Sequence, residues 1–247
     1  MSRPAPIARG AAPALPVLHV TRLRCGYGAA TVVHGVDLEI GAGEVLALLG
    51  KNGMGKSTLL KGIMGFLPLQ SGHIKLFGED VTGLPPHLLA RHTIAYSPQE
   101  QALFQDLTVE ENLKLVVRDR QVLERGIERV GAFFGFIPQR LRQRAGTLSG
   151  GEQKMLLVAR ALMGRPRLML IDEISEGLQP SVIERLAGVL RAERSETGCS
   201  ILLVEQNVGF ALSVADRFAV LQSGEIVDQG AVGDEDASQR ILMRLSV

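Results

Sequence analysis

The chain has 247 residues, and its 27 lysines and arginines nearly balance its 26 aspartates and glutamates. A net charge near +1 gives no sign of broad nucleic-acid binding, so we expect no nucleic-acid partner. The two cysteines lie far apart without metal-ligand spacing, which suits a reducing compartment, and no apolar run reaches the roughly 18 residues of a membrane span.

Residues 1–16 form a segment rich in proline and alanine, with no apolar periodicity. It lacks the apolar stretch of about 7–15 residues that signal peptides need, so the sequence predicts a disordered N-terminal extension. The pattern changes at Val17. Apolar and polar residues alternate over 17–24 and 31–40, which predicts half-exposed antiparallel strands.

Three continuously apolar runs follow, and they are typical of strands buried on both faces of a parallel sheet. They lie at 44–49, 168–171 and 200–204. Helical patterns separate them, at 56–64, 151–163 and 182–195. A charged segment at about 100–150 predicts further helices at 109–117 and 121–134. We therefore expect an α/β core with an inserted helical subdomain.

The run that says most about chemistry is an apolar strand leading into the pattern G-x-x-x-x-G-K-S. Glycines let backbone N–H groups close around a polyphosphate, and the following helix directs its positive end at the same anion. Lys56 adds a charge to the outer phosphates, and the Ser57 hydroxyl is placed to bind Mg²⁺. The alternative is a glycine-rich turn without a ligand. The predicted nucleotide-binding residues here are Gly50, Lys51, Asn52, Gly53, Met54, Gly55, Lys56, Ser57 and Thr58.

Two carboxylates, Asp172 and Glu173, come directly after the apolar run 168–171. They should emerge at the carboxyl end of a parallel strand, where open α/β sheets bind ligands. Asp172 fits a Mg²⁺ ligand acting through water, and Glu173 could polarise an attacking water. Adjacent acids after a strand also serve as helix caps, and the upstream phosphate loop is what favours the catalytic interpretation.

A second glycine-containing helix start reads Ser149, Gly150, Gly151 and Glu152. Ser149 could be a simple helix cap, but a Ser-Gly-Gly turn at a helix N-terminus is also an anion site. One nucleotide cannot easily occupy both helix starts of one subunit. The sequence therefore predicts a two-fold dimer, in which the Ser149 loop of each subunit closes over the nucleotide of the other.

The phosphate loop, the Leu-Ser-Gly-Gly-Glu-Gln motif at 148–153 and the acid-ended strand at 168–173 together resemble the ATP-binding subunits of ABC transporters. The resemblance covers 17–247. It implies a P-loop NTPase (RecA-like) core with an antiparallel β subdomain and an inserted helical subdomain. It also implies ATP and Mg²⁺ as ligands, and ATP hydrolysis coupled to transmembrane transport.

The same resemblance assigns roles to single residues. Tyr27 matches the aromatic residue that stacks on adenine, and Gln99 matches the glutamine that couples Mg²⁺ and water to the helical subdomain. Gln206 falls where most members have a histidine, and a glutamine can hydrogen-bond a phosphate but carries no charge. The implied catalytic residues are Glu173, Lys56, Gln99 and Gln206, and the implied Mg²⁺ ligands are Ser57, Gln99 and Asp172.

Departures from the general pattern narrow the family. The chain has V-E-Q-N at 204–207 and E-G-L-Q-P at 176–180, where Gln179 replaces the usual aspartate. With L-P-P-H at 84–87 and L-T-V-E-E-N-L at 107–113, these motifs resemble the ATPases of the hydrophobic amino acid uptake family, which imports branched-chain amino acids. Its close relatives import urea or short amides. The resemblance to lipid-export ATPases is weaker, because those typically keep the histidine.

The implied partners are transmembrane permease subunits, contacted around 99–112, and a second ATP-binding subunit that is identical or merely similar. A periplasmic or extracellular solute-binding protein would act indirectly. The implied location is cytoplasmic, on the inner face of the cell membrane. Other functions are disfavoured: a kinase or GTPase by the 148–153 motif, a soluble mechanical ATPase by the lack of a coiled coil or second copy, and an inert ATP-binding regulator by the intact Lys56, Asp172 and Glu173.

Overall fold

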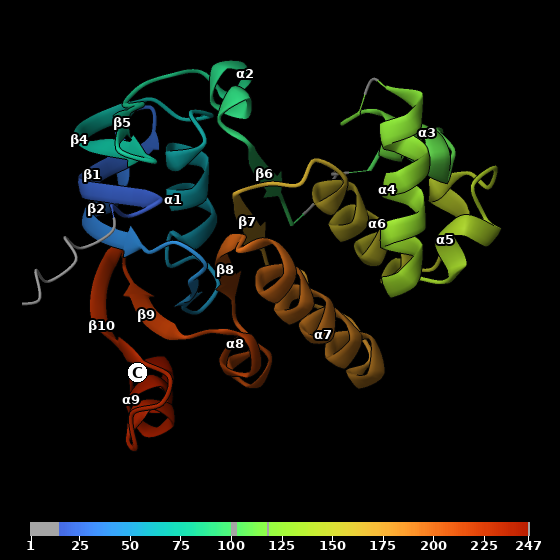
Figure 1. The fold of residues 1–247 in the computed structure, drawn as a ribbon. Coiled ribbons are helices and arrows are strands. Elements are labelled where there is room, and N and C mark those ends of the chain that lie inside the picture. The colour runs from blue at the N-terminus through green and yellow to red at the C-terminus, as the bar shows by residue number, and fades with distance from the viewer. Residues whose placement is uncertain (1–14, 100–102, 118, 247) are drawn as a thin grey trace, which may run out of the picture.

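The computed structural model of the chain describes residues 15–99, 103–117 and 119–246. The predicted N-terminal extension at 1–16 therefore lies outside the described residues, except for its last two. Among the described residues, the strands form a four-stranded sheet in the order β2-β1-β4-β5 and a six-stranded sheet in the order β10-β9-β3-β8-β7-β6. Figure 1 shows helix α1 lying between the two sheets, and the helices α3 to α6 standing on the opposite side of the larger sheet.

The smaller sheet confirms the prediction from alternating residues. Its pairs β1–β2, β1–β4 and β4–β5 are all antiparallel. Along β1 and β2, buried side chains alternate with more exposed ones because one face packs on α1 and the other faces solvent. The strands are β1 (Leu18–Tyr27), β2 (Ala30–Ile40), β4 (Leu69–Leu76) and β5 (Glu79–Asp80).

The larger sheet confirms the prediction of buried parallel strands. Every residue of β3, β7 and β8 is buried, and these strands pair in parallel with one another and with β6 and β9. Strand β10 runs antiparallel along β9. The strands are β3 (Val45–Leu49), β6 (Ile94–Ser97), β7 (Leu168–Asp172), β8 (Ser200–Glu205), β9 (Arg217–Gln222) and β10 (Glu225–Ala231).

Helices cover the larger sheet on both faces. The helices predicted at 151–163 and 182–195 are present at Gly150–Met163 and Pro180–Thr197, within one or two residues of their expected bounds. Proline at the first position of α7 moves its start two residues ahead of the predicted 182. The helices next to the sheets are α1 (Lys56–Ile63), α2 (Pro86–Leu89), α7 (Pro180–Thr197), α8 (Val208–Val214) and α9 (Ala237–Ser246), with 3₁₀ turns η1 (Ala90–His92) and η2 (Ala145–Thr147).

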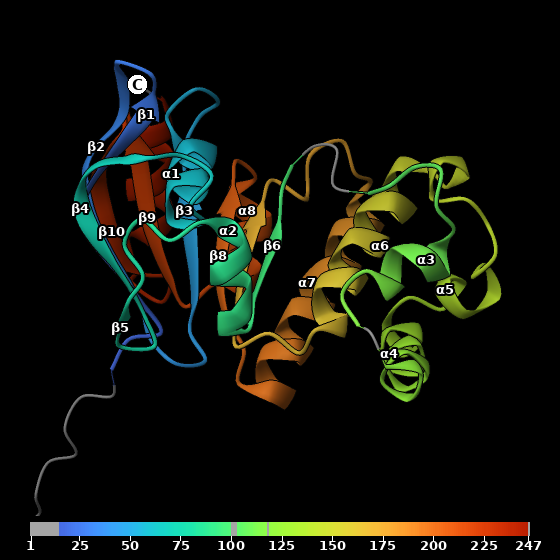
Figure 2. The same ribbon diagram turned by 90° about the horizontal axis from the view of Figure 1, so that it is seen from above.

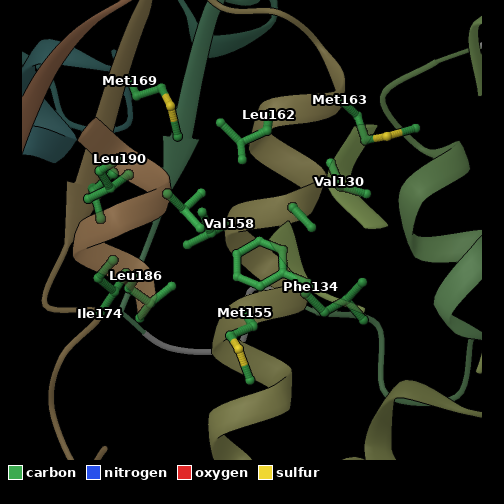
Figure 3. Packing of buried hydrophobic residues seen from close by; sticks show 14 of the residues in the cluster. Val130, Phe134, Met155, Val158, Leu162, Met163, Met169, Ile174, Leu186 and Leu190 are labelled. Atoms are coloured by element: carbon green, nitrogen blue, oxygen red, sulfur yellow. The ribbon is translucent and has the colours of Figure 1, made fainter. Parts of the chain in front are cut away.

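The helical part comprises α3 (Val109–Lys114), α4 (Arg120–Phe133), α5 (Phe136–Gln139) and α6 (Gly150–Met163). Helix α6 runs alongside α7, and α4 packs on its other side (Figure 2). In Figure 3, Phe134 and Val130 point at α6 from one side, while Met169 and Leu186 approach it from the other. The same apolar cluster thus joins the helices to β7 and α7, so the division at about 100 and 150 stays a prediction.

No helix in the described part of the chain is long and apolar enough to cross a membrane.

Candidate functional site

The phosphate-loop pattern forms a tight loop between β3 and α1. Gly55 has φ +100°, a left-handed conformation that costs an L residue about 1–2 kcal/mol. A Cβ on Gly50 would lie 2.6 Å from the carbonyl oxygen of Leu221. The turn between β9 and β10 closes over the loop, because the Gly224 amide donates to the Met54 carbonyl at 3.0 Å. Both glycines are therefore required by geometry, and the loop is held from outside.

Lys56 is the first residue of α1 and is only 4% exposed. Its ammonium donates to the carbonyl oxygens of Gly50 at 2.8 Å and Lys51 at 2.9 Å, inside the loop. It also forms an ion pair with a Glu173 carboxylate oxygen at 2.8 Å. The loop and the acid-ended strand, far apart in sequence, thus meet at this one ammonium group.

Asp172 ends β7 beside the same helix start. Burial raises the pKa of its carboxyl to about 6, and the hydrogen bond that it accepts from the Ser57 hydroxyl opposes that rise. Its Oδ1 is buried and has no hydrogen-bond partner among the described residues. A hydroxyl next to an unpartnered buried carboxylate oxygen is the hard-oxygen environment that Mg²⁺ prefers, so these two residues fit the predicted metal.

Glu173 stands at the centre of the polar groups. Its backbone has φ +47°, which is uncommon for a residue with a side chain. One carboxylate oxygen pairs with Lys56, and the other accepts from the Gln99 side-chain amide at 3.0 Å. The same amide donates to Glu176 at 2.8 Å. The structure therefore brings together Lys56, Gln99 and Glu173, three of the four residues that sequence predicted to be catalytic.

Gln206, the fourth, lies just beyond the carboxyl end of β8, which pairs with both β3 and β7. It is exposed, while Glu205 before it is buried. Tyr27 lies at the end of β1 with its side chain 50% exposed, and the Lys61 ammonium sits 6.0 Å from the ring centroid. The proposed roles of these two residues stay predictions.

The second helix start, at α6, caps itself. Ser149 is the N-cap residue: its hydroxyl accepts from the Glu152 amide at 3.3 Å, and the Glu152 carboxylate accepts from the Ser149 amide at 3.0 Å. Arg140 donates to the same carboxylate at 2.9 Å. The Glu152 side chain is thus turned back onto its own helix start, and the predicted role of Ser149, Gly150, Gly151 and Glu152 toward a second subunit stays a prediction.

Besides Glu176, three polar residues at the site were missed by sequence reasoning. They are Lys154 on α6, Ser175 after β7, and Glu205 at the end of β8. The Glu205 carboxylate accepts from the Ser175 amide at 3.0 Å and from its hydroxyl at 2.6 Å. A usable signal was present, since Glu205 ends an apolar run, just as Asp172 does.

Comparisons with known proteins agree with this geometry. The sequence profile of the ABC transporter family matches residues 33–176. The high-affinity branched-chain amino acid transport ATP-binding protein BraG of Pseudomonas aeruginosa is 43% identical over 209 residues, covering 83% of this chain and 89% of BraG. The chain belongs to the ABC transporter family.

Two further comparisons agree. The probable branched-chain amino acid transport ATP-binding protein LivF of Archaeoglobus fulgidus is 36% identical over 220 residues, covering 88% of this ABC chain and 93% of LivF. The crystal structure of a nucleotide-free ATP-binding cassette from an ABC transporter superposes with a TM-score of 0.82, covering 93% of this chain and 96% of that one at 23% identity. The predicted fold class, a P-loop NTPase core with an antiparallel β subdomain, is confirmed, and the chain is an ATPase of this family.

Proposed function

We propose that this ATPase is the nucleotide-binding subunit of an importer for branched-chain amino acids. The observation that carries the proposal is its similarity to BraG and LivF over most of its length, in a chain that has V-E-Q-N at the end of β8. Those two relatives are named for branched-chain amino acid transport. The proposed location is the inner face of the cell membrane, next to the permease.

Binding of ATP would use the backbone of the phosphate loop, because α1 begins without any side chain capping its N–H groups. Tyr27 would stack on the adenine. A γ-phosphate competes with Glu173 for the Lys56 ammonium, so its arrival loosens the 2.8 Å ion pair. The carboxylate released from Lys56 is then available to accept a proton from the attacking water.

Ser57 and Asp172 would hold Mg²⁺, with Gln99 completing the predicted ligand set. When bound, Mg²⁺ neutralises charge that develops on the β- and γ-phosphate oxygens. Gln99 also donates to Glu173, so it would keep the carboxylate oriented toward the water. Gln206 would donate a neutral hydrogen bond to the γ-phosphate. Phosphoryl transfer needs mostly positioning and charge stabilisation, and these residues supply both.

Closure of two ATPase subunits would bring the Ser149 loop of one onto the nucleotide of the other. The permease contact is supported by a groove of about 620 Å³ with polar and apolar lining between β6 and the helical part, near the predicted 99–112 region. Its rim includes Phe104, which is 59% exposed, and Leu115, which is 52% exposed. An importer ATPase of this kind would pass the closing motion to the permease here, and a solute-binding protein would deliver the amino acid on the far side.

The test is transport by the assembled complex. The chain would be co-expressed with the permease genes next to its own, reconstituted in proteoliposomes, and supplied with internal ATP and the cognate solute-binding protein. We expect uptake of labelled leucine that unlabelled isoleucine and valine inhibit, and urea or acetamide do not. Uptake of urea or acetamide in place of leucine would move the chain to the amide importers, and ATP hydrolysis stimulated only by a lipid would move it to the lipid exporters.

A further inference from the structure

The segment Glu173, Ile174, Ser175 and Glu176 follows β7 and carries the proposed base. Its backbone departs from ordinary geometry, with φ +47° at Glu173. A non-glycine residue keeps such a conformation only where surrounding groups hold it there. The groups that hold this segment come from two elements distant in sequence, α6 and the end of β8.

The first holder is Glu205, whose side chain is almost fully buried, at 1% exposure. Its carboxylate accepts from the Ser175 amide at 3.0 Å and the Ser175 hydroxyl at 2.6 Å. It also accepts from the backbone amides of Gln206 and Asn207. A buried carboxylate without hydrogen bonds would be very unfavourable, so the two loops that supply these donors are tied to one group.

The second residue that holds this segment is Lys154, on the second turn of α6. Its ammonium donates to the carbonyl oxygen of Glu173 at 3.4 Å and to that of Glu176. Lys154 is five residues from Ser149 on the same helix, so the helix start expected to meet the partner's nucleotide is joined directly to the backbone of the proposed base.

We propose that Lys154 and Glu205 are positioning residues that set the place of Glu173, one from the helix that begins at Ser149 and one from the strand that ends before Gln206. The inference rests on the proposed function, in which Glu173 activates the water. As a consequence, Glu205 fixes the position of Gln206 relative to Glu173. Lys154 transmits any displacement of α6 on dimer closure to the Glu173 carboxylate.

The Glu205 contact is tested by three variants of the full chain: Glu205→Ala, Ser175→Ala and their combination. The readouts are kcat and KM for ATP, MgATP affinity and thermal midpoint. We expect kcat to fall by about tenfold or more in each variant while KM and affinity stay within about twofold, the pattern of an interaction that acts on the transition state. The double variant should be no slower than the slower single variant, because Glu205→Ala already removes the hydroxyl hydrogen bond that Ser175→Ala removes.

Two conservative variants keep the test decisive if Glu205→Ala folds poorly. Ser175→Thr retains a hydroxyl and should keep at least half of the wild-type kcat. Glu205→Gln retains one acceptor oxygen and should lie between wild type and Ser175→Ala. Glu225→Gln, at an exposed position on β10, is the matched control and should leave all readouts unchanged.

The Lys154 contact is tested by Lys154→Met against Lys154→Arg, with Lys75→Met on the exposed face of β4 as control. Arginine keeps donors for the two carbonyl oxygens, so we expect it to retain more turnover than methionine, again with KM nearly unchanged. Variants that lower only the thermal midpoint, or that keep kcat within about twofold, would overturn the inference. So would additive losses in Glu205→Ala and Ser175→Ala.

Failure of the proposed role of Glu173 in activating the water has a different signature. It would appear as full turnover in Glu173→Gln, whatever the positioning variants do, and that result would overturn the inference as well. If Glu173→Gln abolishes turnover while the variants at Lys154 and Glu205 leave it unchanged, only the inference is overturned.

Discussion

The two glycine-containing helix starts of this chain look alike in sequence and differ in how their N–H groups are used. Helix α1 begins after Gly55, which is left-handed and offers no side-chain cap. Helix α6 begins after Ser149, where hydroxyl and Glu152 carboxylate complete a reciprocal cap. The N–H groups at the start of α1 therefore stay available to a bound phosphate. At the start of α6, side chains already satisfy some of the N–H groups. This suits a primary nucleotide site on α1 and an accessory contact from α6.

The largest expected effect tests whether both helix starts contact the γ-phosphate of one nucleotide. Glu173→Gln keeps the shape of the side chain and removes the base, so turnover should fall by roughly 10²–10⁴-fold while MgATP binding stays near wild type. The unhydrolysed nucleotide should then hold two subunits together, and gel filtration with MgATP should show a dimer. Retention of more than about half of the activity would contradict the assignment of the base, and Glu225→Gln serves as the unaffected control.

The next effect concerns the α1 side alone. Tyr27→Ala should weaken ATP binding by about 1–3 kcal/mol, the range found for stacking of a base on an aromatic side chain. Tyr27→Phe keeps the ring and should bind within about twofold of wild type by the same reasoning. Titration with a fluorescent ATP analogue measures both. Equal affinity in Tyr27→Ala and wild type would remove this residue from the adenine site.

A matched pair of substitutions compares the starts themselves. Gly55→Ala forces a side chain into φ +100°, so it should cost about 1–2 kcal/mol of stability and weaken nucleotide binding by the isolated subunit. Ser149→Ala removes the cap and should cost about 1 kcal/mol of stability with nucleotide binding by the isolated subunit unchanged. Urea unfolding and ATP titration separate the two. If Ser149→Ala weakened nucleotide binding by the isolated subunit, the division between primary and accessory contact would be wrong.

Gln206 belongs to neither start, and its expected effect is smaller. Gln206→Ala removes one neutral hydrogen bond and should raise the activation free energy of hydrolysis by about 1 kcal/mol. Gln206→His should be tolerated, since histidine is the commoner residue at this position in the family that the chain resembles. Steady-state ATPase rates with the permease present decide the matter. A wild-type rate in Gln206→Ala would mean that the residue has no part in the site.

The last effect is a pH dependence of stability on the α1 side. Burial raises the pKa of Asp172 from 3.8 to about 6, so the folded chain holds a proton that the unfolded chain releases between these values. Because the folded state binds more protons there, this group's contribution to stability is greatest below about pH 4 and falls as the pH rises to about 6. Asp172→Asn should lack this dependence. Urea unfolding without Mg²⁺ at pH 4.5 and 6.5 measures the difference, and parallel curves for the two proteins would contradict it.

The sequence alone determined the features that are local in the chain. The phosphate loop could be predicted because its glycines, Lys56 and Ser57 are contiguous and their backbone geometry is set by residue type. The cap at α6 follows from serine and glutamate three residues apart. The buried strands β3, β7 and β8 could also be predicted, since a short unbroken apolar run is typical of a strand buried on both faces. The strands β5 and β6, by contrast, have only two and four residues, too few to show a period. Strand β9 contains an apolar run that was not recognised.

Only the tertiary structure decided which distant groups share the site. The order β3-β8-β7 places Lys56, Gln206 and Glu173 at neighbouring strand ends, and nothing in their spacing along the chain reveals that order. The contact between Glu205 and Ser175 spans 30 residues, and the one between Gln99 and Glu173 spans 74. A residue type predicts what a side chain can donate or accept, but its partner depends on which strands pair, and pairing is set by packing of the whole core.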